Sequence, residues 1–249
     1  MRALHVAASG MTAQQTRIDT VANNLANVNT TGFKKSRATF QDVFYEELAG
    51  GARGARADLG GGSTLAGLVK NHSQGSVEQT GDALHVAISG PSMLVLNDRQ
   101  GNAVYTRDGS LRIDADGLLR SASGLAVRGS IVVPEGSTEF QVDVDGTVRV
   151  RLEGDDRPTV VGQLELAKFV NPAGLKALGS NNFMATAQSG DAMADDGATE
   201  IRQGYLETSN VDVAEELIQL VTAQRAFELN SKVIQAADEA LQVANNLKR

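Results

Sequence analysis

The side chains that most often perform chemistry in proteins are scattered along this sequence. Its three histidines, His5, His72 and His85, fall in three different segments, and no two have the spacing of metal ligands. A histidine on its own is more often structural than catalytic. The chain has no cysteine, which excludes disulfides, thiolate metal sites and a cysteine nucleophile. We therefore predict no catalytic residues, no metal site and no cofactor.

Two acidic motifs resemble the start of a calcium-binding loop. They begin at Asp114 and Asp143, and each reads Asp-x-Asp-Gly. A complete loop needs a bidentate glutamate at its twelfth position, which here is Leu125 or Gly154. Hairpin turns account better for both motifs.

Two further catalytic signatures are incomplete or missing. The glycine-rich run 60–64 lacks the lysine of a phosphate-binding loop. The sequence also contains no Gly-x-Ser-x-Gly elbow. We predict that the protein is not an enzyme, and a hydrolase acting on cell-wall material is a less favoured alternative.

The strongest pattern is an apolar repeat of seven residues at each end of the chain, which is typical of helices that pack along a seam. The N-terminal repeat consists of Leu4, Met11, Ile18 and Leu25. The C-terminal repeat consists of Val213, Leu220, Phe227, Ile234 and Leu241. We predict one helix over residues 3–29, roughly 40 Å long, with Gly32 in a left-handed conformation after its end. We predict another helix from Asp212 to about Leu247, roughly 50 Å long, with Asp212 and Glu215 as a capping pair.

The far side of the first predicted helix is small, polar and uncharged. Its members are Ser9, Thr12, Thr16, Asn23, Asn27 and Thr30. A solvated helix face normally carries lysine and glutamate. We infer that this helix is contacted on both sides, and an ordinary helix with a mildly polar outer face is the alternative.

The middle of the chain has the pattern of antiparallel strands. Residues 36–48 form an amphipathic segment, and a glycine-rich linker follows it. Residues 76–170 contain short alternating runs separated by Asp-Gly turns at Gly109, Gly117 and Gly146, where glycine would supply a positive φ. Residues 171–200 are polar and irregular. The fold class is thus α+β, with long terminal helices in a coiled coil and a β-rich middle domain, either a small sandwich or a partly closed barrel.

Composition limits the protein class further. Of the 249 residues, 41% are apolar, which is enough for a packed core, and the formal charge of −7 argues against nucleic-acid binding. No run reaches the roughly 18 apolar residues that cross a bilayer. The first 20 residues also lack the pattern of a cleaved secretory signal.

Several longer motifs resemble those of the bacterial flagellar axial proteins, the rod and hook family. The most specific are ANNLANVNTTGFKK at 22–35, GYLETSNVDVAEEL at 204–217 and QRAFELNSK at 224–232. YTRDGS at 105–110 and NPAGL at 171–175 are similar to middle-domain motifs of rod members. The length and the paired terminal motifs are most similar to distal-rod subunits, although segments 49–64 and 89–93 depart from their usual pattern.

The resemblance implies a structural subunit of the flagellar basal-body rod. Such proteins pair their terminal helices in a discontinuous assembly domain, here 1–35 with 205–249. The segment 36–75 would be the amphipathic segment and linker, and 76–204 the β-rich domain. The implied polymer is helical and hollow, and it transmits torque from the motor to the hook.

The resemblance also implies the location and partners. The subunit would pass through the flagellar type III export apparatus without a cleaved signal peptide and assemble in the periplasm. Its partners would be copies of itself, proximal-rod and hook proteins, and the bushing rings around the rod, with no nucleic acid and no membrane insertion.

Three alternatives remain beside this hypothesis: a proximal-rod or hook subunit, the wall hydrolase, and a self-contained binding module whose helices pack only within one chain. The candidate assembly interface consists of Leu4, Met11, Ile18, Asn23, Leu25, Asn27, Val213, Leu220, Phe227, Ile234 and Leu241.

Overall fold

The structure, a computed structural model, describes residues 2–43, 46–48, 57–154 and 157–246. It is an α+β fold with two helices and a strand-rich middle. The chain divides into two compact units. Unit 1 comprises the described residues of 1–26, 36–70 and 212–249, and unit 2 comprises those of 27–35 and 71–211.

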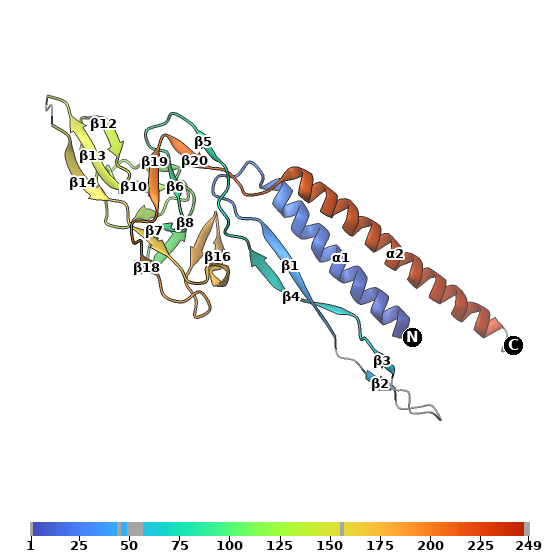
Figure 1. Cartoon of the computed structure of the whole chain (residues 1–249). Helices are drawn as coiled ribbons and strands as arrows, with labels where there is room; N and C mark the ends of the chain where they lie inside the picture. Colours follow the sequence, from blue (N-terminus) through green and yellow to red (C-terminus); the bar gives the residue numbers. More distant parts are fainter. Residues whose placement is uncertain (1, 44–45, 49–56, 155–156, 247–249) are drawn as a thin grey trace. The chain divides into compact units, whose positions relative to one another are not determined.

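Unit 1 contains both helices. Helix α1 (Arg2–Ala26) and helix α2 (Val213–Asn246) lie side by side, with the strand pair β1–β4 beside α1 (Figure 1). Strands β1 (Ser36–Asp42) and β4 (Ser63–Lys70) pair antiparallel, with a register shift between Thr39 and Phe40. Strands β2 (Glu46–Leu48) and β3 (Ala57–Leu59) form a second antiparallel pair.

The ends of the two helices follow from local chemistry. Asp212 caps α2, because its Oδ1 accepts hydrogen bonds from the backbone N–H groups of Ala214 at 2.8 Å and Glu215 at 3.2 Å. Helix α1 ends at Ala26, three residues before the predicted boundary, and a turn follows. Gly32 adopts the expected left-handed conformation, with φ at +65°.

Unit 2 is built from short antiparallel strands. One sheet has the order β16-β17-β8-β7-β11-β10-β9, and β15 joins it by pairing with β7 and β18. Its strands are β7 (Met93–Asn97), β8 (Ala103–Thr106), β9 (Leu111–Ile113), β10 (Leu119–Ser121), β11 (Ala126–Val127), β15 (Leu166–Lys168), β16 (Lys176–Gly179), β17 (Asn182–Met184) and β18 (Met193–Ala194).

Smaller sheets complete unit 2. Strands β12 (Ser137–Val142), β13 (Thr147–Leu152) and β14 (Thr159–Gln163) form a three-stranded sheet. Two further pairs join early strands to late ones: β6 (Val86–Ser89) with β19 (Glu200–Gln203), and β5 (Val77–Gln79) with β20 (Tyr205–Glu207). A short 3-10 helix covers Pro172–Gly174.

The apolar core lies mainly in unit 2. One cluster packs side chains from β6, β7 and their neighbours, with Leu94, Leu96, Leu119 and Val148 almost fully buried. A second cluster gathers around Tyr105 and Phe183. In the described part of unit 1, by contrast, the buried apolar side chains are Ala7, Val21 and Ala223. The two units therefore differ sharply in how much apolar surface each buries by itself.

Two expectations about the middle of the chain need correction, and the structure specifies the elements of a third segment. The described sheets are open, and they include no closed barrel. Residues 171–200 are not irregular throughout, because they contain β16, β17 and β18. The segment 36–48 contributes strands β1 and β2, while Phe44 lies outside the described residues. Cross-strand pairing with β4, a partner distant in sequence, determines the structure of β1.

Candidate assembly interface on the helical unit

One side of α2 packs against α1. Along this side, less exposed residues recur every three or four positions, as helical periodicity requires. They are Glu216, Leu220, Ala223, Phe227, Asn230 and Ile234. Ala223 has no exposed surface. The seven-residue apolar repeat therefore contributes to the side that packs within unit 1.

The helices approach closely where α1 has a glycine. A Cβ added to Gly10 would lie 2.9 Å from the Nδ2 atom of Asn230. A glycine in a helix interior costs helix stability, about 1 kcal/mol relative to alanine. At this position, the missing side chain leaves room for the amide of Asn230.

A buried polar joint connects α1, β1 and α2. The Nδ2 group of Asn24 donates to the backbone carbonyl of Ser36 at 2.9 Å and to the Oε2 atom of Glu216 at 3.1 Å. Its Oδ1 atom accepts from the Ser36 N–H at 2.9 Å. Asn24 and Glu216 are only 1% and 2% exposed. This geometry fixes the register of the three elements, because a shift would leave buried polar groups without partners.

Sequence reasoning chose the neighbouring asparagine, Asn23, which is exposed. The signal for Asn24 was present: it lies three residues after Val21, an apolar residue of the same helix, and therefore on the same side of that helix. Asn24 was not included because the seam was predicted from hydrophobic residues, and asparagine is polar.

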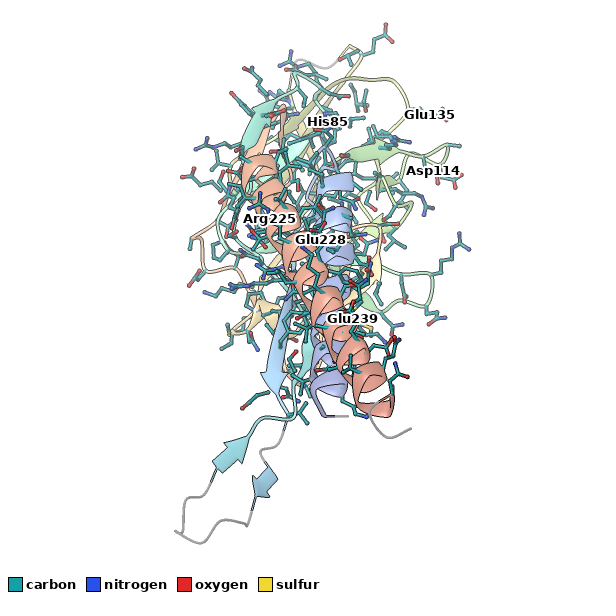
Figure 2. The ribbon with its side chains drawn as sticks, turned by 90° about the vertical axis from the view of Figure 1, so that its right-hand side faces the viewer. His85, Asp114, Glu135, Arg225, Glu228 and Glu239 are labelled. Atoms are coloured by element: carbon teal, nitrogen blue, oxygen red, sulfur yellow. The ribbon has the colours of Figure 1, made fainter. Side chains whose placement is uncertain are left out.

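The opposite side of α2 carries a set of exposed apolar residues, here called the outer stripe, and Arg225 lies among them. At 3.6 residues per turn it falls roughly half a turn from the side packed on α1. It consists of Ile218, Val221, Leu229, Val233 and Val243, whose exposed fractions run from 48% to 68%. Figure 2 shows α2 with Arg225, Glu228 and Glu239 labelled along its length. A helix that is apolar on two sides is typical of a helix buried on two sides.

The β1–β4 hairpin adds further exposed apolar surface to unit 1. Phe40 pairs with Leu65 across the hairpin, and both are exposed. Leu68 and Val69 on β4 are exposed too, Leu68 by 58%. Leu68 and Val69 are consecutive in β4 and therefore lie on opposite faces of the hairpin, so both faces expose apolar side chains.

The predicted interface residues take different positions. Most of them are half-buried in unit 1: Leu4, Met11, Ile18, Leu25, Leu220, Phe227 and Ile234. Val213 is 43% exposed. Asn27 lies in the turn after α1, where it accepts a hydrogen bond from the Thr30 hydroxyl at 3.2 Å. The side chain of Leu241 lies outside the described residues. None of these positions tests whether a second chain binds there.

Two threonines of the polar stripe, Thr12 and Thr16, already have partners within their own helix. The hydroxyl of Thr12 donates to the carbonyl of Ala8 at 3.1 Å, and that of Thr16 donates to the carbonyl of Thr12 at 3.0 Å. These bonds satisfy the hydroxyls without a neighbouring chain. The outer stripe of α2 is therefore the stronger argument for a second contact.

Residues that could perform chemistry do not converge. Among the described residues, no group of three or more His, Cys, Asp and Glu side chains could hold a metal. Nδ1 of His85 lies 2.9 Å from the Thr80 hydroxyl, and His72 packs edge-on against Phe183. The motif at Asp114, labelled in Figure 2, is a hairpin turn in which Gly117 N–H donates to the Asp114 carbonyl at 2.9 Å.

Unit 2 has a cavity of about 550 Å³ beside β15 and β18, and Tyr105, Arg128, Glu165 and Asp195 contribute to its lining. Burial disfavours the Asp195 carboxylate, but hydrogen bonds from Ser92 and Thr199 outweigh this effect and lower its pKa. Asp195 is therefore a structural anion that connects loops through hydrogen bonds.

No helix in the described part of the chain is long and apolar enough to span a membrane.

Comparison with known proteins bears on the whole chain. Residues 4–34 match the family described as flagella basal body rod protein, and residues 87–150 match the flagellar hook protein FlgE/F/G D1 domain. Residues 202–247 match the flagellar basal body rod FlgEFG protein C-terminal family. The chain is 43% identical to the flagellar basal-body rod protein FlgG of Borreliella burgdorferi, an alignment covering 100% of this chain and 99% of that protein.

The chain belongs to the FlgG family of flagellar basal-body rod proteins. It is also 38% identical to FlgG of Caulobacter vibrioides and 37% identical to FlgG of Bacillus subtilis, with 100% of both chains covered in each case. The expected resemblance to the rod and hook family is thereby confirmed. The matched terminal segments contain most of α1 and all of α2, the two helices of unit 1.

Proposed function

We propose that this protein is a structural subunit of the distal rod, which assembles with copies of itself into a helical polymer. Family membership supports a place in the rod, and the similarity to FlgG of other bacteria supports the FlgG subunit within it. The polymer would be the hollow shaft that transmits motor torque to the hook. The alternative, a proximal-rod or hook subunit, would assemble through the same kind of helix contacts but with different neighbouring proteins.

The observation that carries the proposal is the two-sided α2. One side packs on α1 within the chain, and the outer stripe is exposed over much of the helix length. A helical polymer needs heterologous contacts that do not close on themselves. We propose that α1 and α2 pack as a coiled coil and that the outer stripe binds a neighbouring subunit. Asn23 and Asn27 would contribute to register between subunits.

The wider context follows from the family. Neighbouring proximal-rod and hook proteins, the bushing rings and the flagellar type III export apparatus would be its partners. The rod would lie in the periplasm, and its subunits would be exported without a cleaved signal peptide. No catalytic step is assigned to the protein.

The outer stripe is tested by placing a charge in it. Leu229→Glu puts a carboxylate at a position that is 62% exposed in the single chain. We expect the purified variant to unfold at the same denaturant concentration as the wild type, because the position packs against little within the chain. In cells that carry only this variant, rods should fail to assemble and swimming should be lost, since a carboxylate would have to be buried in a contact that an apolar side chain makes in the wild type.

Gln235→Glu is the matched control, because it adds the same charge to an exposed position away from the outer stripe. It should preserve swimming. Normal swimming by Leu229→Glu would contradict the proposed contact.

The same swimming assay with Asn27→Leu tests the register role of Asn27. Loss of rod assembly by a variant that stays soluble supports this role, and normal motility counts against it.

A further inference from the structure

Unit 2 buries three charged side chains that the proposed assembly does not use. Lys34, Arg107 and Glu207 have side chains that are 0%, 3% and 0% exposed. The Nζ atom of Lys34 lies 2.5 Å from Oε1 of Glu207, and Nη1 of Arg107 lies 3.3 Å from Oε2 of the same carboxylate. Two cations therefore share one carboxylate, with one oxygen directed to each.

The surrounding backbone completes the cluster. Lys34 Nζ also donates to the carbonyl of Ser73 at 2.7 Å. Arg107 donates to the carbonyls of Ile88, at 3.1 Å, and Gly90. The Gly75 N–H donates to Oε1 of Glu207 at 2.8 Å. Buried charges of this kind are tolerated where hydrogen bonds and counter-charges replace water.

The sequence positions of the three residues give the cluster its significance. Lys34 lies in the segment 27–35, here called the entering segment, which belongs to unit 2 and connects α1 to β1. Glu207 ends β20, in the segment through which the chain leaves unit 2 towards α2. Arg107 follows β8 in the core sheet. One carboxylate thus holds the entering and leaving segments and also contacts the core.

One backbone hydrogen bond and the side chain of Asn210 also hold the same two segments. The Gly32 N–H donates to the backbone carbonyl of Glu207 at 2.8 Å. Asn210 accepts from the Lys35 N–H at 2.8 Å, and its Nδ2 group donates to the Asn71 carbonyl at 2.9 Å. Release of either segment would break bonds that the other one needs.

We propose that Glu207 is a latch: it makes the docking of two segments, 27–35 and 204–211, on the rest of unit 2 interdependent. With Glu207 in place, residues 27–35 and 204–211 stay docked together. Without its charge, Lys34 and Arg107 face each other as buried cations, and both segments leave the core. This device does not depend on the proposed function, because it operates within a single chain.

The charge arrangement predicts an asymmetry between variants. Removing Lys34 leaves the carboxylate paired with Arg107, and removing Arg107 leaves it paired with Lys34. Removing the carboxylate leaves two buried cations without their shared counter-charge. Burial disfavours the charged form of Lys34 and lowers its pKa, Glu207 opposes that effect, and Arg107 lowers the pKa further. Loss of Glu207 should therefore have a larger effect than loss of either cation.

The first test uses the wild-type full-length protein, so that it does not depend on a variant that folds. Hydrogen exchange is followed in increasing concentrations of urea below the unfolding transition. The amides of Gly32, Gly75 and Thr208 should open in one common step, with the same opening free energy and the same urea dependence. Separate openings of the entering and leaving segments would overturn the latch.

The second test compares Glu207→Gln with Lys34→Met. Glu207→Gln should accelerate exchange in both segments by about tenfold or more, since hydrogen bonds to a charged group are lost. The Val95 amide in β7, which donates to the Glu165 carbonyl at 3.0 Å, is the internal control and should be unaffected. Lys34→Met should have the smaller effect. An equal or larger effect of Lys34→Met, or acceleration of one segment alone by Glu207→Gln, would refute the proposal.

Discussion

At the scale of single residues, identical sequence features serve different physical purposes. Gly117 and Gly146 follow aspartates in hairpin turns and have φ angles of +74° and +85°, as predicted. The same prediction is wrong for Gly109, which has no positive φ. A Cβ at Gly109 would lie 1.6 Å from the Val86 carbonyl oxygen, so glycine is required there by the close approach of another strand.

Asn24 gives a residue-scale prediction. Asn24→Ala removes three hydrogen bonds and leaves the buried Glu216 carboxylate without this donor. We expect the free energy of unfolding to fall by about 2–4 kcal/mol. Urea unfolding followed by the helical circular dichroism signal measures the change.

Thr12→Ala is the control for this variant, because its exposed hydroxyl bonds to its own helix. It should leave the stability nearly unchanged. Equal stabilities of Asn24→Ala and the wild type would show that the buried joint contributes nothing.

At the scale of elements, α2 is the part of the molecule that local sequence describes best. Its seven-residue repeat and the cap at Asp212 predicted a helix from Asp212 to about Leu247, and the structure has Val213–Asn246. The same repeat did not reveal the outer stripe, because a seven-residue repeat identifies the apolar residues on one side of a helix only. Strand β1 shows the opposite case, since the local pattern of residues 36–48 does not identify β4 as its partner.

Packing between the helices gives a prediction at this scale. Ala223→Leu adds three carbon atoms at a position with no exposed surface. We expect a loss of about 1–3 kcal/mol in the free energy of unfolding from overpacking. Thermal unfolding of the dilute protein measures it.

Ala236→Leu is the matched control on the same helix, at an exposed position. It should be neutral in the dilute protein. Equal destabilisation by the two leucines would mean that helix α2 is not packed on α1 through Ala223 in solution.

At the scale of the whole molecule, the two units have unequal cores. Unit 2 contains both apolar clusters, whereas the buried apolar side chains in the described part of unit 1 are Ala7, Val21 and Ala223. Unit 1 also exposes the outer stripe and the apolar residues of the β1–β4 hairpin. The molecule thus combines a β unit that has its own apolar core with a helical unit that exposes apolar side chains to solvent.

This inequality predicts a difference in hydrogen exchange. In the dilute monomer, the amides of α1 and α2 should exchange faster than those of β7 and β8, because less apolar surface is buried around them. Assembly should protect the helices selectively. Helix amides that are as protected as β7 in the dilute monomer would favour the self-contained module over the polymer.

The sequence by itself determined the two helices, the capping residue, many of the strands and the family. These features depend on residues a few positions apart, which periodicity and motifs record. Only the tertiary structure decided that Asn24 is buried and Asn23 exposed, and that Lys34 meets Glu207 across 173 residues of sequence. The physical reason is that the free energy of a buried polar group depends on partners brought together by folding, and the local sequence does not encode those partners.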